Sequence, residues 1–434
     1  MSLLPALRRR TRLIALVPLA AVLLTACGNE EVVVIRTTVT PGQTSSAGDG
    51  GVAQPSSDAP STAGSPQPTS KGSGLAGQIR VIANPEFGKK DIGPNDPISV
   101  TVFSGTISAM KVEAGDGTPI AGEVSADKTT FTVKDRLAYG LTYTFAGTAT
   151  APDGTTKKIG GKLSTVDPAD TVRTAVQIPE GGTVGVGAPI SVTFCPAVQD
   201  KAAAQKALEV TTDKKDIPGS WGWLADEEFS AGEGVCSQVH YRPKDYWPAN
   251  TKVKLTANLL GVNYGNGWGR EDLVRNFTVG RSLVMKAEVS TMRLVVIKDG
   301  SVFRNYKASY GKESVPGRTT VSGIHIVQKT YPTFKMCNPT YGYCNLLEKW
   351  AIRINNNGEF IHENEKVEQA GLLGVQNVSH GCINLGGVDA KELYDMVIYG
   401  DPVEVSGTSV QISPKDYIYD WGYTWDEWQT LSAL

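Results

Sequence analysis

Several common functions receive little support from this sequence. The apolar run Leu13–Leu24 is too short for a comfortable membrane span. Positive and negative charges nearly balance, with 42 Lys and Arg against 44 Asp and Glu, so no polycationic surface for nucleic acid is implied. The four histidines and six cysteines show no CxxC or HxxxH spacing, so zinc is a weak alternative and no metal is expected.

The length and composition favour a multidomain, β-rich protein. A chain of 434 residues is too long for one compact core. It suggests about three domains of roughly 100–150 residues each. The 47 glycines and 24 prolines are a modest enrichment, which fits many loops together with disordered stretches.

The amino-terminal residues have the layout of a signal peptide. A basic patch of Arg8, Arg9, Arg10 and Arg12 precedes the apolar run, and small residues lead to Cys27. This end resembles the bacterial lipobox, which implies a signal peptide over 1–26 and a lipid on Cys27. Two or more acyl chains there would anchor the protein to the outer face of the cytoplasmic membrane. The alternative is that Cys27 merely lies near an ordinary cleavage site.

Residues 27–76 are expected to form a disordered linker. They are rich in Ser, Gly, Pro and Thr and have hardly an aromatic residue. Such a composition cannot bury enough apolar surface to fold. A tether of this kind would let an anchored body work some distance out in the cell wall.

Two tandem immunoglobulin-like β-sandwiches are predicted, over 77–168 and 169–280. Short alternating strands broken by turns are typical of this fold. A weak internal repeat supports the pair, since Pro97–Val102 recurs as Pro189–Phe194. An aromatic-turn-strand element also recurs, as Tyr139–Phe145 and Tyr246–Leu255.

The aromatic residues of these domains have two interpretations. Trp221, Trp223 and Trp268 suggest packing in a core or between domains, with an aromatic binding face as the alternative. His240 lies beside strand residues and is interpreted as structural.

Residues 281–407 are also predicted to be mainly β-structure, with a pattern of strands that differs from that of the sandwiches. The stretch 292–302 predicts a strand, an Asp-Gly turn and a returning strand, and 319–326 predicts another strand. A helix is expected over 388–399, with Gly400 as its stop.

The final segment, 408–434, contains three tryptophans at helical spacing. Trp421, Trp425 and Trp428 would share one face of a helix and pack against the preceding domains.

The cysteines can be divided by role in an exported protein. Cys27 is assigned to lipid; Cys195 and Cys236 lie in one predicted β domain; Cys337 and Cys344 lie close together in one loop. Both of these pairs are disulfide candidates. Cys382 is left over, and an odd thiol in an oxidising compartment is unusual unless it is used.

The residues around Cys382 suit nucleophilic chemistry. A cysteine nucleophile needs a base and donors for the developing oxyanion. Gly381 would let the backbone approach a substrate closely, and amides near Gly381 and Cys382 would point at one oxygen. His362 lies upstream at the end of a strand-like segment.

The segment Ser379-His380-Gly381-Cys382-Ile383-Asn384, with His362 upstream, resembles the signature of the L,D-transpeptidases. Thr340-Tyr341-Gly342 is similar to a lid motif of that family. The Trp-rich tail and tandem immunoglobulin-like domains resemble its actinobacterial branch. The resemblance implies a mainly β chain of two immunoglobulin-like sandwiches, a catalytic β-sandwich-like domain with a short helix, and the Trp-rich segment.

The resemblance also implies roles for individual residues. Cys382 would be the nucleophile and His362 the general base, while Tyr341 and the amides near Gly381 and Cys382 would serve the oxyanion site and lid. The pocket floor would be shaped by Ser379, His380 and Asn384. His325 is interpreted as structural, and His380 is not expected to be the base.

Two departures from the family pattern stand out. Glu363 stands where a serine follows the histidine in the better-known branch, so a backbone carbonyl would have to orient the ring. The pair Cys337 and Cys344 is not general to the family, and a disulfide that stiffens the lid is expected.

The implied reaction is peptidoglycan cross-linking. Cys382 would attack the third residue of a tetrapeptide stem, release D-alanine, and pass the acyl group to another stem as a 3→3 cross-link. Stem peptides are the expected partners, carbapenems the expected covalent inhibitors, and no cofactor is required.

Two rival interpretations use other classes of function. A secreted cysteine peptidase would use water as acceptor, but in the NlpC-type enzymes the cysteine precedes the histidine, whereas His362 precedes Cys382 here. A non-enzymatic wall-binding lipoprotein would carry a dead catalytic domain. The acceptor preference, oligomeric state and role of the immunoglobulin-like domains are not determined by the sequence.

Overall fold

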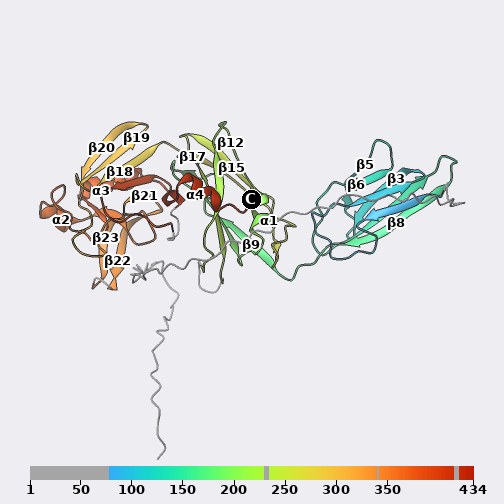
Figure 1. The fold of residues 1–434 in the computed structure, drawn as a ribbon, viewed down its shortest axis with the longest axis horizontal. Helices are drawn as coiled ribbons and strands as arrows, with labels where there is room; N and C mark the ends of the chain where they lie inside the picture. Colours follow the sequence, from blue (N-terminus) through green and yellow to red (C-terminus); the bar gives the residue numbers. More distant parts are fainter. Residues whose placement is uncertain (1–77, 229–233, 340–341, 415–419) are drawn as a thin grey trace, which may run out of the picture.

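The computed structural model describes residues 78–228, 234–339, 342–414 and 420–434. The predicted signal peptide, Cys27, the linker and Tyr341 lie outside the described residues. The described chain is mainly β-structure with short helices, as expected from the sequence (Figure 1). Among the described residues no helix is long and apolar enough to cross a membrane.

The first sandwich comprises two antiparallel sheets, in residues 80–164. One sheet has the order β1 (Arg80–Asn84), β2 (Ser99–Phe103), β6 (Thr130–Val133), β5 (Gly122–Val124). The other has the order β4 (Pro119–Ile120), β3 (Thr106–Ala114), β7 (Thr142–Thr150), β8 (Thr156–Ser164). Alternate residues of β2 and β7 point inward, so Val100 and Phe145 meet in a shared core.

The second sandwich covers residues 171–279 and is also built from two sheets. The first has the order β10 (Thr183–Val184), β17 (Leu273–Val279), β15 (Thr251–Ala257), β12 (Leu208–Thr212). The second has the order β13 (Gly219–Trp223), β14 (Ser237–Pro243), β11 (Ile190–Cys195), β9 (Thr171–Val176), β16 (Trp268–Gly269). Helix α1 (Lys201–Lys206) precedes β12. Cys195 and Cys236 are bonded, with an S–S distance of 2.05 Å.

The internal repeat and the tryptophans behave as the sequence predicted. The repeated Pro-Ile-Ser-Val-Thr segments lie at β2 and β11, one in each sandwich. Trp221 and Trp223 are buried in the second core. Trp268 packs edge-on against Tyr139 of the first sandwich, with ring centroids 6.1 Å apart. Packing, and not a free aromatic face, explains these rings.

The third unit, residues 283–406, carries two sheets around a separate core. One has the order β20 (Ser301–Lys307), β19 (Arg293–Lys298), β18 (Leu283–Glu288), β26 (Pro402–Ser406), β21 (Gly323–Ile326). The other has the order β22 (Lys329–Asn338), β23 (Tyr343–Arg353), β24 (Phe360–Glu363), β25 (Ile383–Leu385). Helices α2 (Glu365–Gln369) and α3 (Gly387–Met396) complete the unit.

The predicted hairpin in this unit is confirmed. Lys298 pairs with Ser301, and the two turn residues Asp299 and Gly300 have φ values of 49° and 82°. Positive φ at both positions is what a two-residue turn needs to match the twist of its strands. The strand predicted over 319–326 is shorter than expected, because only 323–326 pairs with β26.

The predicted helix over 388–399 is also shorter than expected. It ends at Met396, because Val397 is already extended. The following residues instead contact the second sandwich: the amide of Gly185 donates to the carbonyl of Tyr399 at 2.7 Å. A Cβ on Gly400 would lie 2.3 Å from the Cβ of Ala188. Gly400 therefore permits close contact between two units and does not cap the helix.

The carboxyl-terminal segment differs from the single helix that the tryptophan spacing predicted. Trp421 lies in a short 3-10 helix, η2 (Asp420–Gly422), and the other two rings lie in α4 (Trp425–Thr430). Thr424 caps α4 through a reciprocal hydrogen-bond pair with Glu427, which starts a new helix there. The prediction of one continuous helical face is wrong for this reason.

The three tryptophans nevertheless converge on one buried cation. The Arg242 guanidinium carbon lies 4.7, 5.5 and 5.0 Å from the ring centroids of Trp421, Trp425 and Trp428. Arg242 belongs to β14 of the second sandwich and is almost fully buried. Such an arrangement is favourable because the guanidinium is attracted to aromatic faces when both are out of water.

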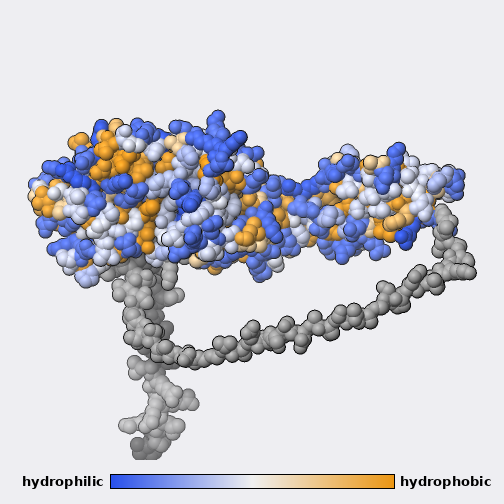
Figure 2. Space-filling model, turned by 45° about the horizontal axis from the view of Figure 1, so that its top comes forward, coloured by the Kyte–Doolittle hydropathy of each residue, from blue (hydrophilic) through white to orange (hydrophobic). Residues whose placement is uncertain are grey.

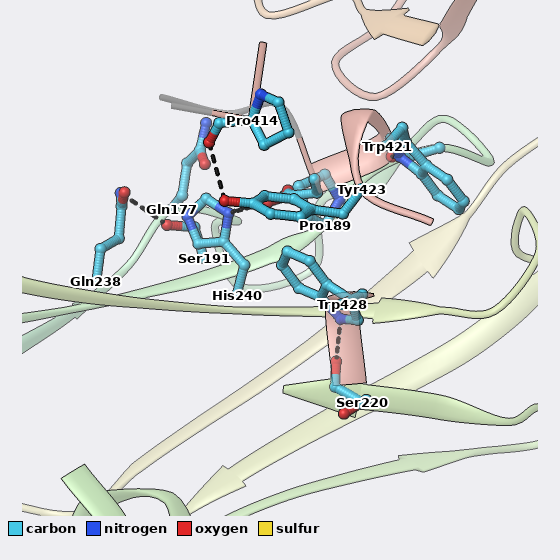
Figure 3. A network of polar contacts seen from close by, with 12 residues as sticks. Gln177, Pro189, Ser191, Ser220, Gln238, His240, Pro414, Trp421, Tyr423 and Trp428 are labelled. Carbon is cyan, nitrogen blue, oxygen red and sulfur yellow. Dashed lines mark hydrogen bonds and ion pairs between the residues drawn. The ribbon is translucent and has the colours of Figure 1, made fainter. Parts of the chain in front are cut away.

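Further hydrogen bonds hold the same segment against the second sandwich (Figure 3). Trp428 Nε1 donates to the carbonyl of Ser220 at 3.0 Å. The Nδ1 atom of His240 lies 2.9 Å from Asp420 Oδ1, and both side chains are buried. The interpretation of His240 as structural is consistent with this pairing. The chain therefore returns from the third unit to pack on the second (Figure 1).

The first sandwich joins the second through a narrow junction (Figure 2). The hydroxyl of Tyr139 donates to the carbonyl of Gly269 at 2.8 Å and accepts from the amide of Gly261 at 2.9 Å. Arg136 forms an ion pair with Asp272 across the same junction. These polar contacts join the two sandwiches together with the ring contact between Tyr139 and Trp268.

The tail packing predicts a large loss of stability in Trp428→Ala. Removing a fully buried indole is expected to lower the free energy of unfolding by about 3–5 kcal/mol. Denaturant unfolding measures this change. Leu434→Ala is the matched control, because Leu434 belongs to the same tail but is 66% exposed. Equal unfolding midpoints for wild type and Trp428→Ala would contradict the packing role.

Candidate active site

The site forms where two short strands of the third unit run side by side. Strands β24 and β25 are parallel, and His362 is the register partner of Asn384. Cys382 immediately precedes β25, which brings its side chain to the neighbouring strand. The thiol of Cys382 lies close enough to the imidazole of His362 to raise the pKa of that ring. The structure thus brings together the two residues that the sequence singled out.

The orientation of His362 is set by its other ring nitrogen. Its Nδ1 lies 2.7 Å from the backbone carbonyl oxygen of Glu363. A carbonyl can only accept, so Nδ1 carries the proton and Nε2 is left to face the thiol. The backbone carbonyl of Glu363 therefore orients the ring, although the residue is not a serine.

A carboxylate that the sequence analysis missed also contacts this nitrogen. Oε2 of Glu348, from β23, lies 3.3 Å from Nδ1 of His362. Burial is the largest influence on the pKa of His362 and lowers it. Hydrogen bonds and charge interactions with Cys382 and Glu348 outweigh burial and raise that pKa to about 10.

Cys382 is half-buried beside an apolar cluster. It packs against a group formed by Phe334, Met336, Ala351 and Phe360. Its sulfur lies 3.9 Å from the carbonyl oxygen of Gly358. Among the described residues Cys382 is the free cysteine, whereas the other four are bonded in pairs.

Ser379 shapes the loop that presents Cys382. Its hydroxyl donates to the carbonyl of Cys382 at 2.6 Å and accepts from the amide of Gly381 at 3.1 Å. Gly381 has a φ of +126°, a backbone conformation that residues with a side chain rarely adopt. Its amide is already engaged, so of the two amides expected to face an oxyanion, that of Cys382 is the remaining candidate.

Asn384 lies beside His362 on the same face of the sheet, because register partners on adjacent strands point the same way. The residue is 1% exposed, and neither its Oδ1 nor its Nδ2 has a hydrogen-bond partner in the described part of the chain. An unpaired buried amide is costly. Its position suits a group that becomes paired when a ligand binds.

His380, the other histidine of the Ser-His-Gly-Cys segment, contacts an aromatic ring. Its ring packs on Tyr343, with centroids 5.1 Å apart. Burial lowers the pKa of His380, and the charge of Arg318 lowers it further. Cys382 influences the pKa of His362, whereas the groups that influence the pKa of His380 are its burial and Arg318.

The hairpin of β22 and β23 forms a wall over the site. It supplies Phe334 and Met336 to the apolar cluster and Tyr343 to the contact with His380. Cys337 and Cys344 are bonded near its tip, as expected from the sequence. Tyr341, the predicted lid residue, lies outside the described residues.

A second buried polar group lies under the nucleophile loop. Glu359 accepts from the amide of Val321 at 2.9 Å and from the side chain of Asn355, and lies close to Gly381. Burial raises the pKa of Glu359 to about 8, although its two hydrogen bonds oppose this. His325 lies on the other side of Asn355, and burial lowers its pKa to about 4. Both groups are therefore neutral near pH 7.

Sequence patterns carried little information about these carboxylates. Glu348 follows two leucines and precedes Lys349 in a strand, where a charged residue usually marks a solvated face. Glu359 precedes an apolar pair, and nothing local shows that it is buried.

Within the described ranges there is no group of three His, Cys, Asp or Glu residues suited to a metal ion.

The raised pKa of Glu359 predicts a specific pH dependence of stability. The folded state keeps its proton up to about pH 8, whereas the unfolded chain loses it near the ordinary value of 4.5. The contribution to stability is therefore complete at low pH and is lost as pH rises through this window. The slope is about 1 kcal/mol per pH unit.

Glu359→Gln removes this titration, and denaturant unfolding at pH 5, 6.5 and 8 measures the difference. The variant is expected to lose less stability than wild type between pH 5 and 8. Identical slopes in the two proteins would show that Glu359 is ionised in the folded state.

Comparison with known proteins agrees with this geometry. A model described as the L,D-transpeptidase catalytic domain matches residues 283–405. A bacterial Ig domain model matches residues 89–263, which span parts of both sandwiches.

The relatives extend over most of the chain. L,D-transpeptidase 5 of Mycobacterium tuberculosis (strain ATCC 25618 / H37Rv) is 41% identical over 82% of this chain and 77% of its own length. L,D-transpeptidase 2 of M. tuberculosis (strain CDC 1551 / Oshkosh) is 31% identical over 82% of this chain and 85% of its own length. The solved structure of the LD transpeptidase LdtMt1 in complex with imipenem is 29% identical, with a TM-score of 0.44, and covers 55% of this chain and 100% of that one.

The resemblance carried by the Ser-His-Gly-Cys segment and the upstream histidine is thus confirmed by relatives that cover 82% of this chain. On this evidence, the chain belongs to the L,D-transpeptidases, a family of acyltransferases.

Proposed function

We propose that the chain is a peptidoglycan L,D-transpeptidase that forms 3→3 cross-links through a thioester on Cys382. The observation that carries the proposal is the parallel pairing of β24 with β25, which brings the free, half-buried thiol of Cys382 next to the buried imidazole of His362. Covalent acyl transfer requires a nucleophile paired with a base in this way. Membership of the L,D-transpeptidases supports the same class of reaction.

The first half-reaction acylates the enzyme. Cys382 gives its thiol proton to His362, and the sulfur attacks the carbonyl carbon of the third residue in a tetrapeptide stem. The amide of Cys382 would donate to the developing oxyanion. The C–N bond to the terminal D-alanine then breaks, and His362 returns the proton to the leaving amine. The products are a thioester on Cys382 and free D-alanine.

The second half-reaction transfers the acyl group. A side-chain amine of another stem attacks the thioester carbonyl and gives a proton to His362. The C–S bond breaks, a new amide joins the two stems, and the proton returns to the sulfur. The reaction balances without a metal or organic cofactor.

The apolar wall beside Cys382 favours an amine acceptor over water. Phe334, Met336 and Phe360 cover this side of the sulfur. Exclusion of water from an active site suppresses hydrolysis of a reactive intermediate. The buried amide of Asn384, which has no hydrogen-bond partner among the described residues, would bind a polar group of the stem beside His362.

The proposed setting is the bacterial cell wall. A signal peptide ending before Cys27, lipidation of that residue and the Ser-, Gly- and Pro-rich linker would hold the folded body outside the cytoplasmic membrane. The two sandwiches would then act as spacers between the membrane and the catalytic unit.

Carbapenems are proposed to acylate the same thiol. Their strained lactam is an amide, so attack by the sulfur of Cys382 opens the ring and leaves a stable acyl group on the protein. No amine departs in that reaction, which makes acylation visible as a gain in protein mass.

Cys382→Ala is expected to abolish 3→3 cross-linking of a purified disaccharide-tetrapeptide and the mass gain with imipenem. The thioester forms on the sulfur of Cys382, so a protein without this sulfur cannot form the acyl-enzyme. Product chromatography and intact-protein mass spectrometry measure both effects, and thermal unfolding checks the fold. Retained cross-linking in Cys382→Ala would end the proposal.

The products of the wild-type protein distinguish the alternatives. A tripeptide as the sole product would favour a cysteine peptidase. No reaction at all would favour a wall-binding protein.

The two histidines near the site are expected to differ in their effects. His362→Ala removes the base and should reduce the rate of acylation by about 10²–10⁴-fold. His380→Ala removes a ring that packs on Tyr343 and should reduce the rate less. Stopped-flow measurement of imipenem acylation at fixed pH compares the two. A greater loss in His380→Ala than in His362→Ala would reverse the assignment of the base.

A further inference from the structure

Glu348 approaches the catalytic histidine from a different strand. It lies on β23, which pairs with β24 at Ile352 and Ile361, four residues further along. Its Oε2 atom lies 3.3 Å from Nδ1 of His362. The Glu348 side chain is 13% exposed and that of His362 is 5% exposed, so water screens the interaction weakly.

A carbonyl oxygen and a carboxylate therefore both lie near Nδ1. The carbonyl of Glu363, at 2.7 Å, is the closer acceptor and is sufficient to orient the ring. Glu348 adds a full negative charge that the carbonyl lacks. An opposite charge at this distance favours the protonated form of an imidazole.

The other charged groups around His362 do not cancel this effect. The carboxylate of Glu363 forms an ion pair with Lys349, whose Nζ lies 3.7 Å from its Oε1. In the described part of the chain, the two side chains that raise the pKa of His362 are Cys382 and Glu348. The carboxylate of Glu348 thus acts on His362, while that of Glu363 acts on Lys349.

We propose that Glu348 is a positioning residue that stabilises protonated His362, so that Cys382 and His362 rest as a thiolate–imidazolium pair. The proton moves from sulfur to Nε2: the S–H bond breaks, an N–H bond forms, and the electron pair stays on sulfur. The inference rests on the proposed function only in taking Cys382 as the nucleophile.

This arrangement has two consequences for the reaction. The sulfur is ready to attack before substrate binds, because the thiolate is the nucleophilic form. The proton needed by the leaving amine is already on His362, next to the reacting atoms. The raised pKa of His362, about 10, agrees with a ring that stays charged at neutral pH.

Glu348→Gln tests the role because it keeps the shape of the side chain and removes its charge. The rate of alkylation of Cys382 by iodoacetamide, followed by mass spectrometry of the peptide containing residue 382, is measured from pH 4.5 to 9. The midpoint is expected to rise by about one pH unit, with about a tenfold lower rate on the acidic side. The rate at high pH is expected to be unchanged, because the thiol is fully ionised there.

Glu365→Gln is the matched control. Glu365 is exposed, lies three residues after His362 and hydrogen-bonds Gln369, so it carries the same charge without facing the ring. Its alkylation profile is expected to superpose on that of wild type. A profile of Glu348→Gln that also superposes would overturn the inference. So would an equal shift in Glu363→Gln, because the effect would then be general electrostatics.

If Glu348→Gln does not fold, the inference can still be tested on the wild-type protein. Nitrogen-15 chemical shifts of His362 report the protonation of its ring directly, and a charged ring at pH 8 is expected. A neutral ring at pH 8 would overturn the inference. These results are separate from the proposed function, since alkylation needs no peptidoglycan, whereas loss of cross-linking in Cys382→Ala does.

Discussion

The proposed chemistry depends on the parallel pairing of two very short strands. Strands β24 and β25 are four and three residues long, yet their register sets His362 beside Asn384 and brings Cys382 to the ring. Strands this short need support from outside the pair. Ile361 and Ile383 supply it, because both are fully buried register partners in the core of the third unit. A slip of one residue would turn His362 to the opposite face and dismantle the site.

Around this pairing, polar groups divide into those that build the loop and those left for a ligand. The hydroxyls of Ser379 and Thr320 donate hydrogen bonds to backbone carbonyls of the loop that carries Cys382. The thiol, the Cys382 amide and the Asn384 side chain are not used in that way. A site whose supporting hydrogen bonds are already satisfied holds its reactive groups in place before substrate arrives.

The sequence predicted the features that depend on local patterns and missed those that depend on distant contacts. The motif around Cys382 and the turn at Asp299 are local, and both were identified. The position of Glu348 depends on the pairing of β23 with β24, which no nearby residue signals. The spacing of Trp421 and Trp428 suggested one helix, but contact with Arg242 is made from two.

The proposed role of Cys382 is to carry the acyl group during the reaction. It is tested most directly by mixing the protein with a tetrapeptide donor without an acceptor, quenching in acid, and sequencing the modified peptide by mass spectrometry. This role predicts a mass increase on Cys382 equal to the mass of the donor minus that of D-alanine. Hydroxylamine should remove the added group, as expected for a thioester. Turnover of the donor with the acyl group on another residue, or with none trapped on Cys382, would contradict it.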